Sequence, residues 1–101
     1  MELVKTKSIN DLIDFYGVLL TKNQLNTLEL YYQEDLSLGE IASELNISRS
    51  AVYDSLKRSV DLLKDYESKL KLVAREKSKI KLLKVIDNLD KETIKKEIEK
   101  L

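Results

Sequence analysis

The sequence contains no cysteine, no histidine and no proline, and it has only two glycines among 101 residues. Without cysteine or histidine, a Ser-His-Asp or Cys-His nucleophile system, a Cys/His zinc site, a disulfide and thiol redox chemistry are excluded. The acidic residues show no spacing typical of a metal-binding loop, and this small helical chain gives no sign of the pocket that a paired-carboxylate hydrolase needs. We therefore expect no enzyme activity, no metal and no cofactor.

Long apolar runs are also missing. No run approaches the roughly 18 apolar residues that span a membrane, and residues 1–8 lack the apolar segment of a secretion signal. A chain without cysteine fits a reducing compartment, although it also fits many secreted bacterial proteins. We expect a cytoplasmic protein that is not inserted in a membrane.

Neither sign of charge is in excess, because 18 Lys and Arg residues balance 18 Asp and Glu residues. The charges are unevenly distributed: residues 1–60 hold 6 basic and 9 acidic side chains, whereas residues 61–101 hold 12 basic and 9 acidic ones. The basic residues are densest between residues 69 and 84, where Glu76 is the one acidic residue. We call these basic residues the basic segment: Lys69, Lys71, Arg75, Lys77, Lys79, Lys81 and Lys84. We expect a polyanion to bind there first, although a solvated helix face is the simpler interpretation.

Apolar residues recur at helical spacing along the whole chain, and capping residues rather than breakers must separate the helices. The first helix is expected to bury Ile9, Leu12, Ile13, Tyr16, Leu19 and Leu20, with Ser8 or Asn10 as its cap. A second helix is predicted after Thr21, which forms a capping box with Gln24. This helix is expected to bury Leu25, Leu28 and Tyr31 or Tyr32 and to end near Glu34 and Asp35.

Two further caps lie close together and predict a helix-turn-helix over residues 37–58. Ser37 and Glu40 form a second capping box, and Ser48 is the N-cap of the next helix. Between them stands Asn46, a residue that tolerates left-handed backbone geometry. We expect Leu45 and Ile47 to fill the corner, and Val52 and Leu56 to face the preceding helix.

The second helix of this pair is the expected recognition helix. Its exposed N-terminal half should present six candidate nucleic-acid contacts: Ser48, Arg49, Ser50, Tyr53, Lys57 and Arg58. The basic residues of the segment 37–60 are matched by three acidic ones, namely Glu40, Glu44 and Asp54. Because affinity for a phosphate backbone grows with the number of phosphates neutralised, we expect weak and steeply salt-sensitive binding. Solvated surface charge is the alternative interpretation of the same basic residues.

Apolar spacing continues beyond Arg58 and predicts that the recognition helix runs on without a break for several more turns. The stripe passes through Val60, Leu63, Tyr66, Leu70, Val73, Ile80, Leu83 and Ile86. After a pause at residues 87–90, Asp90 and Thr93 are expected to cap a short terminal helix. We therefore expect a helical domain over residues 1–66 and a basic helical extension over 67–101, both in one structural domain. The stripe has three alternatives: it folds back, pairs with a second copy as a homodimer, or stays exposed for a partner.

The segment 35–59, DLSLGEIASELNISRSAVYDSLKRS, resembles the helix-turn-helix of sigma-factor region 4 and more closely the YlxM-like (UPF0122) family. The resemblance extends over roughly residues 10–75 through DFYGVLLTKNQ and LYYQEDLS. It implies an all-α fold similar to region 4, a DNA- or RNA-binding role, and a link to the signal recognition particle pathway that rests on neighbouring genes. Where region 4 usually carries several basic side chains, this helix has Ser50, Ala51, Tyr53, Asp54 and Ser55.

Two hypotheses follow. The first is a regulatory or accessory protein that binds DNA or the particle's RNA, with Arg49 and Tyr53 at the bases and Lys57 and Arg58 at phosphates. The second is a protein-interaction adaptor that binds the particle's GTPase, or the GTPase–RNA complex, through the basic segment without sequence-specific DNA binding.

Overall fold

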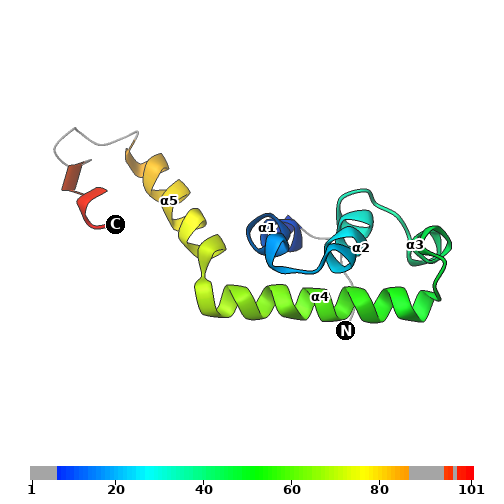
Figure 1. Ribbon diagram of the computed structural model, residues 1–101. Helices are drawn as coiled ribbons and strands as arrows, with labels where there is room; N and C mark the ends of the chain where they lie inside the picture. Colours follow the sequence, from blue (N-terminus) through cyan, green and yellow to red (C-terminus); the bar gives the residue numbers. More distant parts are fainter. Residues whose placement is uncertain (1–6, 87–94, 97) are drawn as a thin grey trace. The chain divides into compact units, whose positions relative to one another are not determined.

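The computed structural model describes residues 7–86, 95, 96 and 98–101, and this part of the chain is all-α without a strand. The elements are α1 (Lys7–Tyr16), the 3₁₀ turn η1 (Gly17–Leu19), α2 (Lys22–Tyr32), α3 (Leu38–Leu45), α4 (Arg49–Leu70) and α5 (Leu72–Ile86) (Figure 1). The predicted fold class is confirmed. The terminal helix expected after Asp90 has its cap outside the described residues.

The chain divides into two compact units, residues 1–71 and 72–101. The domain boundary expected between residues 66 and 67 lies inside α4. That the extension shares one structural domain with the N-terminal part stays a prediction.

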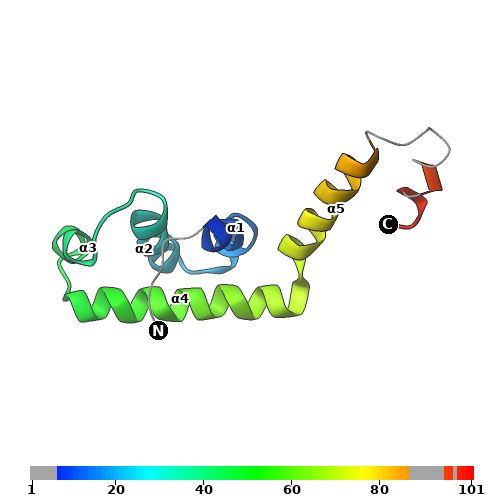
Figure 2. The same cartoon turned by 180° about the vertical axis from the view of Figure 1, so that it is seen from behind.

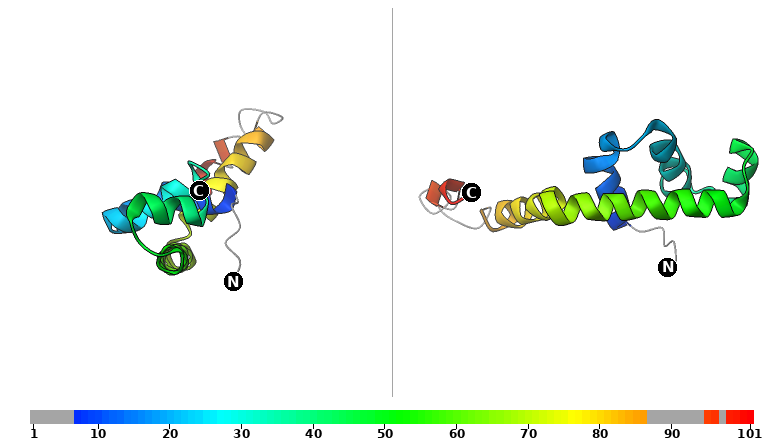
Figure 3. Two further views of the ribbon diagram at one scale, coloured as in Figure 1. Left: turned by 90° about the vertical axis from the view of Figure 1, so that its right-hand side faces the viewer. Right: turned by 60° about the horizontal axis from the view of Figure 1, so that its bottom comes forward.

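In the first unit, α1, α2 and α3 pack along one side of the long helix α4, as the front and back views show (Figures 1 and 2). Seen along α4, the three short helices overlap on one side of the long helix (Figure 3, left). The core side of α4 carries Val52, Leu56, Val60 and Leu63, which are at most 2% exposed. Opposite them, the three short helices bury Ile9, Leu12, Ile13, Tyr16, Leu28, Leu30, Tyr32, Ile41 and Ala42.

Both predicted capping boxes are confirmed. The Gln24 backbone N–H donates to Thr21 Oγ1 at 3.2 Å, and the Thr21 N–H donates to Gln24 Oε1 at 3.1 Å. At α3 the corresponding distances between Ser37 and Glu40 are 3.1 and 3.0 Å. Each box satisfies backbone donors that a helix start leaves without intrahelical partners, so α2 and α3 begin where local chemistry places them. α2 ends at Tyr32, slightly before the predicted Glu34.

The end of the first helix differs from the prediction. α1 already includes Ser8 and Asn10, so neither is its cap, and the chain tightens after Tyr16 into η1. A 3₁₀ turn has about 3.0 residues per turn, which rotates the apolar stripe away from the core. Leu19, predicted to be buried, is therefore 51% exposed, and Val18 is 84% exposed.

Gly17 explains how closely this corner approaches α2. A Cβ atom at Gly17 would lie 2.9 Å from Leu25 Cδ1, so any larger residue requires Leu25 to move.

The predicted continuous recognition helix holds as far as Leu70. There Lys71 adopts the left-handed conformation, with φ 54° and ψ 34°, and its N–H donates to the Glu67 carbonyl at 2.9 Å. The predicted run of several more turns after Arg58 is confirmed, but the helix ends at Lys71 and does not reach Val73. Left-handed helix ends usually carry Gly or Asn, and the sequence has neither at this position.

Two tyrosines are buried in the core. The ring of Tyr32 meets that of Tyr31 edge to face, with centroids 4.9 Å apart. Burial, reinforced by the charge that Tyr31 would carry if ionised, raises the pKa of Tyr32 to about 12. Tyr32 therefore acts as an apolar ring with a neutral hydroxyl at physiological pH.

Tyr16 ties α1 to the C-terminal part of α4. Its side chain is fully buried, and its hydroxyl donates to Glu67 Oε1 at 2.6 Å. A hydrogen bond to a charged group contributes about 1.5–3 kcal/mol, so we expect Tyr16→Phe to lower the free energy of unfolding in urea by that amount. Glu67→Gln keeps an acceptor and should lose less. Unchanged stability of Tyr16→Phe would contradict a stabilising role for this bond.

Candidate functional site: the helix-turn-helix surface

The helix-turn-helix consists of α3, the turn from Asn46 to Ser48, and the start of α4. Asn46 adopts the predicted left-handed conformation, with φ 56° and ψ 46°, and the Ile47 N–H donates to the Ala42 carbonyl at 3.0 Å. Ser48 is the predicted N-cap, because its Oγ accepts from the Ala51 N–H at 3.0 Å. These local bonds end one helix and start the next within three residues.

The interior of the corner agrees with the prediction for Val52 and Leu56, whereas Leu45 is only partly buried. Ile41, Ala42, Val52 and Leu56 are buried between the two helices and their neighbours, as expected for the last two. Ile47, predicted to fill the corner, is instead 44% exposed. The left-handed residue before it reverses the chain direction and turns the Ile47 side chain outward.

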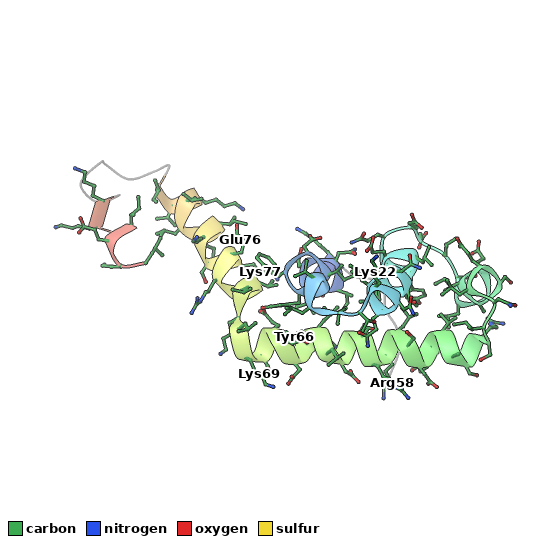
Figure 4. All side chains as sticks on the ribbon, in the orientation of Figure 1. Lys22, Arg58, Tyr66, Lys69, Glu76 and Lys77 are labelled. Carbon is green, nitrogen blue, oxygen red and sulfur yellow. The ribbon has the colours of Figure 1, made fainter. Side chains whose placement is uncertain are left out.

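The structure places the six candidate contact residues at the start of α4 and on its first turns. Ser48, Arg49, Ser50, Lys57 and Arg58 are exposed, and Tyr53 is partly buried. Residues four apart share a side of a helix, so Arg49, Tyr53 and Lys57 form one row, and Ser50, Asp54 and Arg58 form the next. Figure 4 shows Arg58 on the outer surface of α4, at the edge of a depression that it lines together with Gln24 of α2. One carboxylate, that of Asp54, thus lies within the candidate surface.

Arg49 lies against the start of α3. Its Nε and Cζ are 3.8 and 3.9 Å from the position that a Cβ on Gly39 would occupy. A wide, shallow depression of about 770 Å³ lies beside it, lined by Leu36, Ser37, Gly39, Glu40, Ser43, Glu44 and Arg49. Glu40 and Glu44 add two acidic side chains to the same lining as Arg49. We call this feature the α3 groove; sequence reasoning missed it because no local motif encodes the approach of Arg49 to Gly39.

A smaller groove of about 320 Å³ lies where the start of α2 approaches α4. It is lined by Gln24, Ala51, Asp54, Ser55 and Arg58. Asp54 and Arg58 therefore share a surface depression as well as a helix row, and the net charge of this depression is zero.

The basic segment predicted as one cluster is divided between the two units. Lys69 belongs to α4 and pairs with Asp65, with Nζ and Oδ2 3.0 Å apart, and Lys71 is the helix end. The five remaining residues lie on α5 and are exposed: Arg75, Lys77, Lys79, Lys81 and Lys84. Their spacing places Arg75 and Lys79 on one side of α5 and the other three on another side. The segment therefore does not form a single basic face.

Within residues 7–86 and the described residues near the C-terminus, no group of three Asp, Glu, His or Cys side chains is arranged to hold a metal ion. In the same part of the chain, no helix has the length and apolarity needed to cross a membrane.

Comparison with known proteins identifies the family. The family model of UPF0122, described as "Putative helix-turn-helix protein, YlxM / p13 like", matches residues 3–101. A UPF0122 protein of Lactococcus lactis subsp. cremoris (strain MG1363) is 56% identical over 72 residues, which are 71% of this chain and 65% of that protein. UPF0122 proteins of Staphylococcus carnosus (strain TM300) and Staphylococcus aureus (strain JH9) are 54% identical over 74 residues and 58% identical over 71 residues. These matches cover 73% and 70% of this chain and 67% and 64% of the two relatives.

The chain thus spans slightly less than two thirds of the Lactococcus protein. The family match extends over nearly all of the present sequence, and the helix-turn-helix of the structure agrees with the family description. This chain belongs to the UPF0122 family of YlxM / p13-like helix-turn-helix proteins.

Proposed function

We propose that this protein binds nucleic acid through the exposed N-terminal half of α4. The observation that carries the proposal is the pair of capped helices α3 and α4, which buries one side of α4 and leaves the rows from Arg49 and Ser50 exposed. In this arrangement Arg49 and Tyr53 contact bases, Lys57 and Arg58 contact phosphates, and Ser48 and Ser50 lie at the helix start beside the backbone. The protein acts by binding, without catalysis, in the cytoplasm.

We place this activity in the signal recognition particle pathway, as a regulatory or accessory function. This part of the proposal draws on the family resemblance alone. The ligand is either duplex DNA or the particle's RNA. The zero net charge of the surface supports weak binding, because each carboxylate offsets a phosphate-neutralising cation.

Fluorescence-anisotropy titration of the full chain tests the proposal, with duplex DNA from its own promoter and the particle's RNA as ligands at two salt concentrations. We expect Arg49→Ala with Lys57→Ala to lower affinity by about tenfold or more, since one base contact and one phosphate contact are lost. Lys7→Ala with Lys64→Ala removes the same charge elsewhere and should cost far less. Unchanged affinity of the first variant for both ligands would refute the proposal.

The second candidate function is an adaptor for the particle's GTPase, bound through the basic residues of α5. It is favoured by the exposure of these residues on a helix outside the helix-turn-helix unit. In a pull-down with purified GTPase, alone and bound to its RNA, Lys77→Ala with Lys81→Ala should then reduce capture while Arg49→Ala should not. Equal capture by both variants would refute the adaptor.

A further inference from the structure

Helix α5 exposes an apolar stripe that lysines border on both edges. Ile80 and Leu83 are 46% and 59% exposed and, three residues apart, lie on the same side of the helix. Lys77 and Lys84 lie three and four residues from Ile80, and Lys79 lies four residues from Leu83. An exposed apolar stripe of this kind is typical of a surface that binds a partner.

The lysines decide which partner can cover this stripe. If two copies of α5 paired through Ile80 and Leu83, the bordering lysines of both helices would face each other across the seam. Like charges at such positions oppose pairing. The partner must therefore present carboxylates beside an apolar contact.

The same chain carries such a surface on its first unit. From Asn23 to Ser48 there is no Lys or Arg, and the acidic residues are Glu29, Glu34, Asp35, Glu40 and Glu44. The last two line the α3 groove together with Leu36. Glu40 and Glu44 are one helical turn apart on α3, and Lys77 and Lys81 are one turn apart on α5. The two residues of each pair are therefore separated by about 6 Å along the helix.

Each of the two surfaces also carries one residue of the opposite charge to its other charged residues. Glu76 is the one acidic residue of α5, and Arg49 is the one basic residue that lines the α3 groove. Figure 4 shows Glu76 and Lys77 as neighbours on α5. The charges on the two surfaces thus mirror each other, and the whole chain has a net charge of zero.

We propose that α5 of one copy docks in the α3 groove of a second copy. Lys77 and Lys81 face Glu40 and Glu44 of the partner, and Ile80, which lies on the edge of the apolar stripe nearest to these lysines, contacts its Leu36. When each copy contributes its α5 to the other copy, the assembly is a symmetric dimer. Because Arg49 lies in the same groove, docking and the proposed contact of Arg49 with nucleic acid exclude each other.

Sedimentation equilibrium of the full chain, without nucleic acid, tests the docking. We expect a dimer at low salt that dissociates as salt is raised. Lys77→Glu with Lys81→Glu should weaken dimerisation about tenfold or more, because two attractive contacts become repulsive. Ser43→Lys with Glu44→Lys should do the same from the groove side while leaving the capping box of Ser37 and Glu40 intact.

The decisive sample is an equimolar mixture of the two charge-reversed variants. Each variant alone should be monomeric, and the mixture should form a heterodimer in which one reversed α5 docks in one reversed groove. Lys95→Glu with Lys96→Glu changes the charge of the second unit equally and should leave the wild-type dimer intact. Circular dichroism establishes that every variant keeps its helices.

Three results would overturn the docking: a monomeric wild type at low salt, no heterodimer in the mixture, or equal dissociation by the control variant. If the wild type is monomeric and Lys77→Glu with Lys81→Glu instead lowers affinity for RNA, α5 is a nucleic-acid contact. Because association is measured without nucleic acid, its failure leaves the proposed function of α4 untouched.

Discussion

Replacing Leu63 by alanine is expected to lower the free energy of unfolding by about 2–5 kcal/mol, the range for deleting a buried leucine side chain. Leu63 is 0% exposed and lies on the side of α4 that packs against the other helices of the first unit. Alanine removes apolar surface from the core and leaves a cavity that rigid neighbours fill only in part. Urea denaturation followed by circular dichroism measures the loss.

The adjacent residue is the matched control. Leu62 has the same side chain on the same helix but is 37% exposed. We expect Leu62→Ala to cost less than half as much, because less apolar surface is removed from the core and water can occupy the space. Equal losses for the two variants would mean that α4 does not present its Leu63 side to the core.

The same helix provides both the core and the candidate recognition surface, so the two properties can be separated experimentally. Leu63→Ala should reduce nucleic-acid binding only in proportion to the unfolded fraction. A larger loss of binding by the folded fraction would show that the Leu63 side of α4 contributes directly to the ligand.

Replacing Asp54 by lysine is expected to raise affinity for duplex DNA by about tenfold at low salt and to steepen the dependence of affinity on salt. Asp54 stands in the same row as Ser50 and Arg58 and lines the same groove as Arg58. In the wild type its carboxylate opposes the phosphates that Lys57 and Arg58 would approach. Lysine removes this repulsion and adds a cation within the candidate surface.

Asp14→Lys is the control for this prediction. Asp14 is exposed on α1 and the substitution changes the net charge equally. Long-range attraction alone would raise the affinity similarly for both variants, and that result would contradict binding through the first turns of α4. A larger increase for Asp54→Lys than for Asp14→Lys supports binding through the first turns of α4. Anisotropy titration of one duplex over a series of salt concentrations distinguishes the two results.

Much of the fold was predictable because local interactions set most of the helix starts and the turn between α3 and α4. The capping boxes of Thr21 and Ser37 and the cap at Ser48 join residues three positions apart. The end of α3 at Asn46 depends only on the tolerance of asparagine for left-handed backbone geometry. Such interactions depend on short stretches of chain, so the residue types reveal them without knowledge of the tertiary contacts.

Exposure at the helix ends was less predictable. A strict helical repeat placed Leu19 in the core, but the 3₁₀ turn after Tyr16 shifts the repeat. Ile47 was predicted from its apolar side chain to be buried, yet the turn directs it outward. Lys71 ends α4 although its side chain carries no such preference, and a pattern of apolar spacing contains no signal for this end.

The candidate site shows the same division. The exposure of most of its residues was predictable, because a row of exposed polar side chains follows from the buried row on the other side of α4. The arrangement around Arg49 was not, because it depends on how closely α4 approaches Gly39. The division of the basic segment between α4 and α5 likewise follows from the helix end at Lys71.

The sequence by itself determined the helical class, the chemistry that is excluded, the helix starts and the position of the helix-turn-helix. All of these depend on composition or on hydrogen bonds between residues a few positions apart. Only the tertiary structure decided that Tyr16 bonds to Glu67, that Arg49 lies beside two carboxylates in the α3 groove, and that Leu19 and Ile47 are exposed. These features depend on how separate helices pack or on the exact backbone path between them, and residue types alone do not specify either.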